Sequence, residues 1–236
     1  MPQRCLLYYI TDRRQLADDE SARQRKLLDK IAEAARWGVD YVQLREKELC
    51  SRDLGKLAAA AVEVIRKHSS LREAGTESRA TSTRLLINSR SDIALAAGAD
   101  GVHLRSDDIL PRDVRHIWSA ANQRTSNREA RECVVAVSCH SVEDVVRAES
   151  EGADFAAFAP VFGKRDVPQV EAAGLGALRE ACRARIPVFA LGGVTLANAR
   201  DCLDSGAAGI AGIRLFQEND IAQVVKHLSP VLGSER

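Results

Sequence analysis

The chain has 236 residues, of which 45% are hydrophobic and 28% are charged, and its formal net charge is +1. This composition is that of an ordinary globular protein, and it excludes disordered and fibrous classes. The near-neutral charge gives no general attraction to nucleic acid or to an anionic membrane, and no apolar run approaches the roughly 20 residues of a membrane helix. We therefore expect a cytoplasmic protein with no nucleic-acid or membrane partner.

Eight apolar runs follow one another along the chain. In order they are CLLYYIT near the N-terminus, YVQL, LLIN at Leu85 to Asn88, GVHL, VVAVS at Val134 to Ser138, FAAFA, VFALGG at Val188 to Gly193, and GIAGI. Near-continuous apolar runs of this kind are typical of parallel strands that are covered on both faces. Amphipathic patterns between them, such as Leu54 to His68 and Ser141 to Ser150, predict helices.

Four of these runs belong to a repeat, namely WGVDYVQLR, AGADGVHLR, EGADFAAFA and SGAAGIAGI. Each places a glycine after a helical stretch, and glycine suits the left-handed position that ends a helix. These glycines are 60, 54 and 54 residues apart (Gly38, Gly98, Gly152 and Gly206). That spacing fits two strand-helix units, so eight units are expected. They predict a (β/α)8 TIM barrel, a single domain over residues 1–236, although a doubly wound sheet has the same periodicity.

Two polar segments fit no unit, and we expect loops at residues 72–84 and 121–131. Catalytic groups in this fold lie at the C-terminal ends of the strands. Alternation along the second strand points Gln43, Arg45 and Lys47 in one direction, which predicts an anion clamp at the barrel mouth. The alternative is an ordinary solvated loop. Residues 162–174, rich in Gly, Pro and charge, suit a lid over this mouth.

Two further groups of residues follow later strands. Gly192 and Gly193, with the amides near Ile213 and Arg214, predict a phosphate site, because free amides complement negative charge. The alternative is that the glycines only permit close packing, and Thr195 is expected to cap the next helix.

The fourth and fifth strands are followed by acidic and histidine residues. Asp108 suggests Mg²⁺ bridging to a diphosphate; equally, SDDILPRDV reads as a helix start with Ser106 as its cap. His103 and His140 are candidate acid/base groups.

These motifs jointly resemble the family of thiamine-phosphate synthase and its relative, the thiazole tautomerase. The resemblance is carried by YYITD, YVQLREKEL, LLINSRSDIALAAGADGVHL, VAVSCHSVEDVVRAESEGADF, FAPVF, FALGGVT and GAAGIAGI. It implies a transferase that joins hydroxymethylpyrimidine diphosphate to thiazole phosphate and releases pyrophosphate.

The resemblance also implies roles for individual residues. It implies that Gln43, Arg45 and Lys47 hold the pyrophosphate, that Asp108 binds Mg²⁺, and that Ser138 lies at the pyrimidine. The candidate catalytic residues are Gln43, Arg45, Lys47, Ser138, His140 and Lys164. The candidate substrate contacts are Asn88, Arg90, His103, Gly193, Ile213 and Arg214.

The chain departs from the family pattern at three places. Ser89 stands where the family has a second metal-binding Asp. Arg105-Ser106-Asp107-Asp108 replaces Gly-Gln-Glu-Asp, and Phe162 to Asp166 (FGKRD) replaces the Thr-x-Thr-Lys loop. Since Arg binds phosphate oxygens well, Arg105 and Arg165 are expected to compensate for a weakened metal site.

Two alternative functions stay open. One is a thiazole tautomerase that uses His140 as its acid/base group, and the other is a non-catalytic barrel that binds a phosphate ligand. A homo-oligomer is compatible with the sequence.

Overall fold

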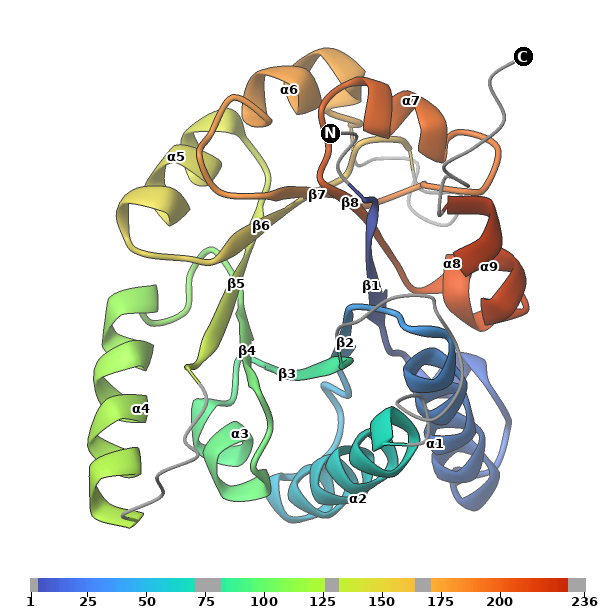
Figure 1. Cartoon of the computed structure of the whole chain (residues 1–236), viewed down its shortest axis with the longest axis vertical. Coiled ribbons are helices and arrows are strands. Elements are labelled where there is room, and N and C mark those ends of the chain that lie inside the picture. Colours follow the sequence, from blue (N-terminus) through green and yellow to red (C-terminus); the bar gives the residue numbers. More distant parts are fainter. Residues whose placement is uncertain (1–3, 71–81, 126–131, 164–170, 229–236) are drawn as a thin grey trace.

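The computed structural model describes residues 4–70, 82–125, 132–163 and 171–228. Eight parallel strands close into a barrel in the order β1 to β8. The helices form a ring around this barrel (Figure 1). The predicted (β/α)8 barrel is therefore confirmed.

The strands are β1 (Leu6–Ile10), β2 (Tyr41–Leu44), β3 (Arg84–Asn88), β4 (Gly101–Leu104), β5 (Val134–Cys139), β6 (Phe155–Phe158), β7 (Val188–Ala190) and β8 (Gly209–Gly212). The helices are η1 (Arg13–Gln15), α1 (Glu20–Trp37), α2 (Ser51–Ser70), α3 (Ser91–Ala97), α4 (Pro111–Thr125), α5 (Val142–Ser150), α6 (Gly174–Ala181), α7 (Ala199–Asp204), α8 (Arg214–Gln217) and α9 (Ile221–Leu228).

Three predicted boundaries are wrong. The expected loop at 121–131 begins as helix, because α4 continues to Thr125. Ser106 does not cap a helix: the Asp108 carboxylate accepts the Arg105 N–H, which closes a separate turn, and α4 starts only at Pro111. Thr195 does not cap α7 either, because its own N–H is bound by the Asn198 side chain and α7 starts after Asn198.

The glycine repeat contains a second device that the sequence analysis did not identify. Gly38 and Gly98 end α1 and α3 with φ of 76° and 68°, as predicted. Two residues after each of the first three glycines stands an aspartate. The carboxylates of Asp40, Asp100 and Asp154 accept backbone N–H groups of β1, β3 and β5 at 2.8, 2.8 and 2.7 Å. Each aspartate therefore fastens the start of one strand to the preceding strand.

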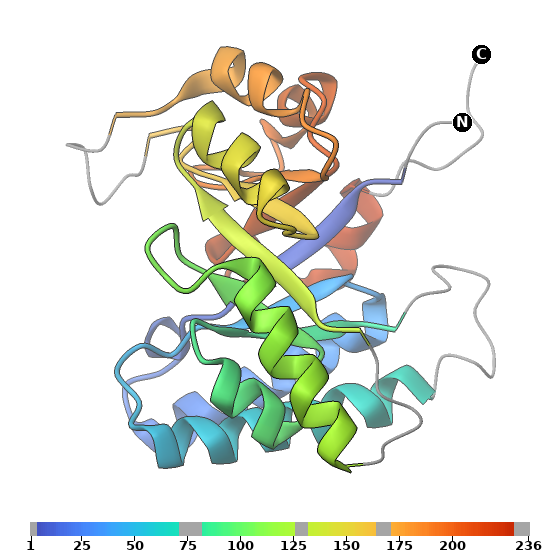
Figure 2. The same cartoon turned by 90° about the vertical axis from the view of Figure 1, so that its left-hand side faces the viewer.

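Side chains that point into the barrel form a core separate from the layer between strands and helices. Its largest members are aromatic: the ring centroids of Tyr8 and Phe155 are 5.4 Å apart, and those of Phe155 and Phe189 are 4.8 Å apart. Tyr41 and Phe155 are the first residues of their strands, so this aromatic core fills the N-terminal end of the barrel. Polar groups occupy the opposite end, where the β4–α4 connection projects (Figure 2).

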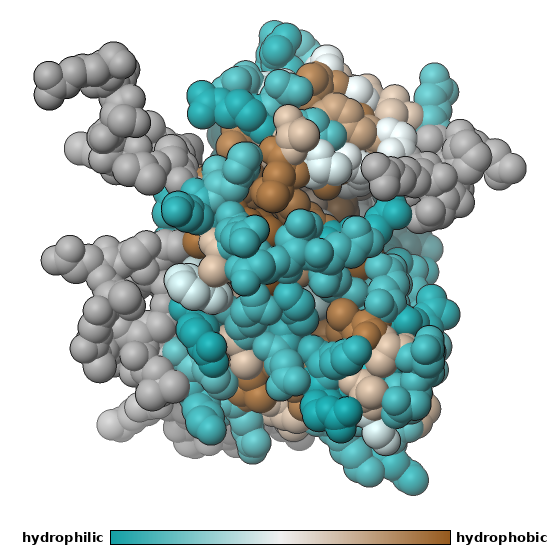
Figure 3. Space-filling view, turned by 90° about the vertical axis from the view of Figure 1, so that its right-hand side faces the viewer, coloured by the Kyte–Doolittle hydropathy of each residue, from teal (hydrophilic) through white to brown (hydrophobic). Residues whose placement is uncertain are grey.

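The outer surface is mainly polar. On the side that carries α8 and α9, hydrophilic side chains predominate and hydrophobic ones gather in the upper half (Figure 3). Among the described helices, none is both long and apolar enough to cross a membrane.

A buried ion pair connects the loops that follow β1 and β2. Arg13 and Glu46 are each 3% exposed, and the Arg13 guanidinium donates to Glu46 at 3.2 Å. The Glu46 carboxylate also accepts the Thr11 hydroxyl at 2.5 Å and the Arg13 backbone N–H at 3.1 Å. Burial raises the pKa of Glu46, and these hydrogen bonds offset part of that rise. The loop after β2 is therefore fixed from inside the protein.

Replacing Arg13 by alanine should lower the free energy of unfolding by about 3–5 kcal/mol, because it leaves the Glu46 carboxylate buried without its cation. Chemical denaturation would measure the change. Arg185→Ala is the matched control: Arg185 also pairs with a glutamate, but its side chain is 94% exposed. The control should change stability by about 0.5 kcal/mol or less. Equal effects of the two substitutions would contradict a special role for the buried pair.

Candidate active site

Four predicted site residues form two hydrogen-bonded pairs above the aromatic core. Gln43 Nε2 donates to Asn88 Oδ1 at 2.9 Å, which joins the ends of β2 and β3. His103 Nε2 lies 2.7 Å from Ser138 Oγ, which joins β4 and β5. Gln43 and His103 are nearly inaccessible, whereas Asn88 and Ser138 are partly exposed. The inner end of the site is therefore polar, and its side chains are hydrogen-bonded to one another in pairs.

The surroundings of His103 define what this residue can do. Its Nδ1 is 2.8 Å from the Tyr8 hydroxyl, so both ring nitrogens have protein partners. Burial, with a smaller contribution from the charge of Arg45, lowers the pKa of His103 to about 3. The imidazole is therefore neutral near pH 7, and it stands behind Ser138 rather than at the surface that a substrate would touch.

The alternating charges after β2 separate into two directions. Glu46 turns inward to Thr11 and Arg13, whereas Arg45 is partly exposed and Lys47 is exposed. Within the described part of the chain, Arg45 forms no ion pair with a carboxylate. The sequence order Arg-Glu-Lys therefore places a buried anchor between two cations, which leaves the Arg45 guanidinium available to an anionic ligand.

Asp108 lies in a network that includes the substituted position Ser89. Ser89 adopts a left-handed backbone conformation with φ of 59°. Its hydroxyl donates to Asp108 Oδ2 at 2.6 Å, and Arg105 donates its backbone N–H to the same oxygen at 2.7 Å. The remaining oxygen, Oδ1, is 3.4 Å from Arg105 Nε. Ser89 thus orients the carboxylate but brings no second negative charge.

These residues fit a magnesium site of low charge. Asp108 is the carboxylate that Ser89 contacts, whereas Asp107 pairs with the Arg105 side chain and is 71% exposed. No cluster of three or more His, Cys, Asp or Glu side chains suited to a metal occurs among the described residues. Mg²⁺ is commonly held by one or two carboxylates together with water and substrate phosphates. One oriented carboxylate therefore fits an ion that arrives with a phosphorylated ligand.

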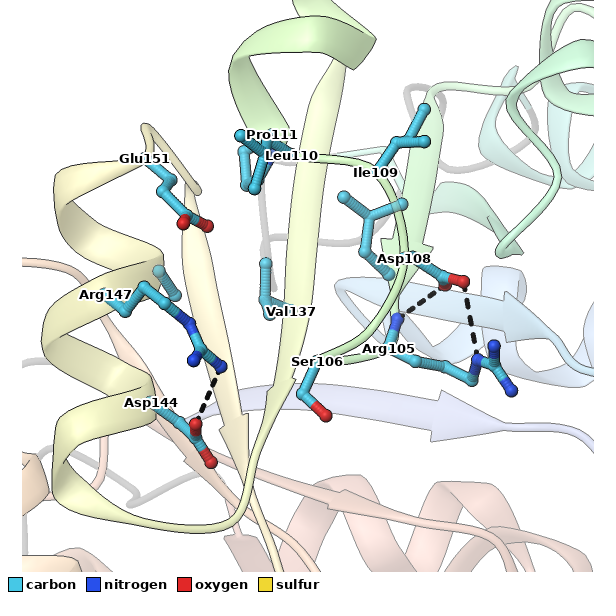
Figure 4. A pocket seen from close by; sticks show the side chains of 12 residues that line it. Arg105, Ser106, Asp108, Ile109, Leu110, Pro111, Val137, Asp144, Arg147 and Glu151 are labelled. Atoms are coloured by element: carbon cyan, nitrogen blue, oxygen red, sulfur yellow. Dashed lines mark hydrogen bonds and ion pairs between the residues drawn. The ribbon is translucent and has the colours of Figure 1, made fainter.

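A pocket of about 210 Å³ lies beside this network but outside the barrel mouth. Arg105 and Asp108 form one wall, and the ion pair of Asp144 and Arg147 stands on α5 opposite (Figure 4). Its lining includes Leu104 and Val137, which belong to the layer between strands and helices. The pocket is thus a gap in the helical layer and does not extend the barrel mouth.

The ends of β7 and β8 supply backbone groups. Gly192 and Gly193 have φ of 91° and 66°, and a Cβ on Gly193 would lie 2.7 Å from the Cβ of Phe162. Close packing alone therefore requires a glycine here, as the alternative interpretation stated. The N–H groups of Gly193 and Ile213 have no acceptor in the part of the chain that the structure describes. Both are therefore open to a ligand.

The other predicted site residues are less closely joined to this network. Arg90 forms a two-point ion pair with Asp92, at 2.9 and 2.6 Å. The exposed His140 donates Nδ1–H to the Ala159 carbonyl at 2.7 Å, which leaves Nε2 as the unprotonated nitrogen of the neutral ring. Arg214 is the partly buried first residue of α8. Lys164 and Arg165 lie outside the described residues.

Sequence reasoning missed three residues of this region, namely Tyr8, Arg13 and Glu46. Alternation contained a signal for Glu46, which has the opposite phase to Arg45 and Lys47. Likewise, one of the two adjacent tyrosines in YYIT had to face the barrel interior.

The fold and the rim define a (β/α)8-barrel enzyme whose mouth presents cations, amides and the oriented carboxylate of Asp108 to phosphorylated small molecules. The sequence model described as thiamine monophosphate synthase matches residues 7–216. The chain belongs to this family. The predicted family and the predicted transferase class are confirmed.

Individual relatives agree with this assignment. The chain is 38% identical over 213 residues to a putative thiamine-phosphate synthase 2 of Aquifex aeolicus, an alignment that covers 90% of this chain and 97% of the relative. It is 34% identical to the thiamine-phosphate synthase of Caldanaerobacter subterraneus, with 94% and 91% covered. A solved structure, the thiamine phosphate pyrophosphorylase of Pyrococcus furiosus, superposes with a TM-score of 0.68 at 27% identity, covering 94% and 93%.

The packing at Gly193 can be tested by substitution. Gly193→Ala should lower the free energy of unfolding by about 1–3 kcal/mol, because the new Cβ meets Phe162 and the backbone is left-handed. The control is Gly176→Ala in α6, where a Cβ would meet nothing within 4 Å. That change should stabilise the protein by about 0.5–1 kcal/mol, since alanine is the better helix former. Thermal or chemical denaturation would show that the two substitutions change stability in opposite directions. A Gly193→Ala variant as stable as the wild type would contradict the packing argument.

Proposed function

We propose that this protein condenses hydroxymethylpyrimidine diphosphate with thiazole phosphate, giving thiamine phosphate and pyrophosphate. The observation that carries the proposal is one hydrogen-bonded chain across three strand ends. Gln43 donates to Asn88 at 2.9 Å, Asn88 to Ser89 at 3.2 Å, and Ser89 to Asp108 at 2.6 Å. This chain supports a single binding surface for the diphosphate end of the substrate.

The proposed reaction needs charge stabilisation at the leaving group. The bond between the pyrimidine methylene carbon and the diphosphate oxygen breaks, and pyrophosphate departs with the electron pair. The thiazole nitrogen then supplies the electron pair for the new carbon–nitrogen bond. Fixed cations aimed at the developing charge lower the barrier. In this protein Arg45 and Lys47 are proposed to stabilise the departing pyrophosphate, without a proton transfer at this step.

We propose that Asp108 also holds Mg²⁺ at the diphosphate. When bound, the ion would neutralise phosphate charge and orient the leaving group. Ser89 replaces a second carboxylate, so the site carries one negative charge fewer than the family pattern. The Arg105 side chain, 3.3 Å from Asp107 and 3.4 Å from Asp108, supplies a cation at the same place. This arrangement supports sharing of charge neutralisation between the ion and Arg105.

The thiazole phosphate is assigned to the ends of β7 and β8. The N–H groups of Gly193 and Ile213, which meet no acceptor among the described residues, support this part of the proposal, because backbone amides bind phosphate oxygens. Ser138 is proposed to contact the pyrimidine.

The alternatives receive less support. A tautomerase would use His140, whose Nε2 is open, but the named relatives are synthases. A non-catalytic barrel would have no reason to keep the connected chain from Gln43 to Asp108. None of the six cysteines, all of which lie in the described part of the chain, forms a disulfide, as is usual in a reducing compartment, which supports a cytoplasmic location. Assembly into a homo-oligomer stays a prediction.

Arg45→Ala should lower kcat/KM for thiamine phosphate formation by on the order of 100-fold, since it removes a cation from the leaving group. A coupled assay of pyrophosphate and thiamine phosphate would measure the loss. Arg185→Ala, which removes an exposed cation far from the mouth, should keep full activity. If the wild-type protein, shown to be folded, formed neither product, the proposed function would be wrong, and isomerisation by wild type and His140→Ala would be measured next.

The assignment of Mg²⁺ to Asp108 has a matched test at adjacent positions. Asp108→Asn should raise the Mg²⁺ concentration needed for half-maximal activity by about 10-fold or more, because it removes the negative charge of the carboxylate that Ser89 orients. Asp107→Asn should change it little, since the Asp107 side chain is 71% exposed and outside the chain of hydrogen bonds. Full activity in the presence of a chelator would contradict the Mg²⁺ assignment and would indicate that Arg105 neutralises the diphosphate charge instead.

A further inference from the structure

We propose that Tyr8 and His103 form a buried positioning relay that fixes the Ser138 hydroxyl as a hydrogen-bond donor toward the barrel mouth. The relay crosses the barrel interior from β1 through β4 to β5. Tyr8 and His103 are both buried, so both would act on a ligand only through Ser138. The existence of the relay is independent of the reaction, whereas the role of its donor in pyrimidine binding rests on the proposed function.

The geometry leaves few partners for these groups. Tyr8 is 0% exposed and its hydroxyl oxygen lies 2.8 Å from His103 Nδ1. His103 is 3% exposed and its Nε2 lies 2.7 Å from Ser138 Oγ. Among the described residues, the hydroxyls of Tyr8 and Ser138 have no other hydrogen-bond partner. Ser138 alone of the three is partly open to solvent.

Counting protons selects one arrangement. A neutral imidazole has one donor and one acceptor nitrogen. If Nδ1 carried the proton, the Tyr8 hydroxyl hydrogen would be buried without an acceptor, a situation that proteins avoid. If Nε2 carries it, Tyr8 donates to Nδ1 and Nε2–H donates to Ser138, so every buried donor is satisfied. The protein therefore holds His103 as the Nε2–H tautomer.

The consequence appears at Ser138. Its oxygen accepts from Nε2–H, so its own proton must point elsewhere, and the open side is the barrel mouth. The Ser138 hydroxyl is then a fixed hydrogen-bond donor in the barrel mouth. It selects a ligand group that accepts a hydrogen bond, such as an aromatic ring nitrogen. A serine without the relay would rotate freely between donor and acceptor, and it would lose this selectivity. Tyr8 thereby influences binding from the far side of the barrel.

The tautomer can be observed directly in the ligand-free protein. Proton–nitrogen correlation spectra of protein labelled with ¹⁵N-histidine distinguish the Nε2–H form, the Nδ1–H form and the imidazolium. We expect the His103 ring as Nε2–H, and in Tyr8→Phe we expect a mixture of the two neutral forms. A wild-type ring in the Nδ1–H form, or a charged ring, would overturn the relay. This measurement requires no activity, so it judges the relay even if the proposed reaction fails.

Kinetics then separate positioning from simple packing. Tyr8→Phe keeps the ring in its aromatic contacts, and it should raise KM for the pyrimidine diphosphate about threefold to tenfold, the equivalent of one hydrogen bond. In a Ser138→Ala background the same substitution should have no further effect, because the relay acts only through that hydroxyl. An equal effect in both backgrounds would mean that Tyr8 has only a structural role.

Tyr9→Phe is the matched control for the adjacent residue. Tyr9 is also 0% exposed, but its hydroxyl meets Gln217 on the outer side of β1 at 3.3 Å. It should leave KM and the His103 spectrum unchanged. A Tyr9→Phe effect as large as that of Tyr8→Phe would overturn the specific role of the relay.

Discussion

The structure depends on one constraint: in a closed sheet, every strand residue faces either the helices or the barrel interior. The interior is narrow, and aromatic rings of Tyr8, Phe155 and Phe189 fill its N-terminal part. Polar side chains that also point into the barrel therefore have room only at the C-terminal ends of the strands. Gln43 follows Tyr41 by two residues, and Ser138 follows Ala136 by two. The same alternation thus builds the packed base and the polar mouth above it.

Much of this arrangement could be predicted because it is encoded locally. Apolar runs and the glycine repeat located all eight strands, and alternation gave the inward direction of Gln43. Two helix starts failed because side chains near Ser106 and Thr195 close turns of their own, and capping residues serve turns as readily as helices. The glycine repeat suggested only helix ends, although its aspartates also bind neighbouring strands.

Contacts between distant residues could not be inferred in this way. Arg13 and Glu46 are 33 residues apart, and Tyr8 and His103 are 95 residues apart. No sequence periodicity links such pairs, because the two residues come together only when the barrel closes. This explains why the sequence did not show that one of the four consecutive charges, Glu46, is buried. It also explains why His103 looked like an acid/base candidate, although burial keeps it neutral.

The aspartates of the repeat have a consequence for how evenly the barrel is closed. Asp40, Asp100 and Asp154 each clasp a pair of strands, but the fourth repeat carries Ala208 at the equivalent position. The junction it would clasp, between β7 and β8, has two paired positions, whereas β8 and β1 have four. The β7–β8 junction therefore has few backbone pairs and no repeat aspartate to support it. A phosphate bound by amides at the ends of both strands would bridge this junction, so a bound substrate would add the connection between β7 and β8 that the fourth repeat lacks.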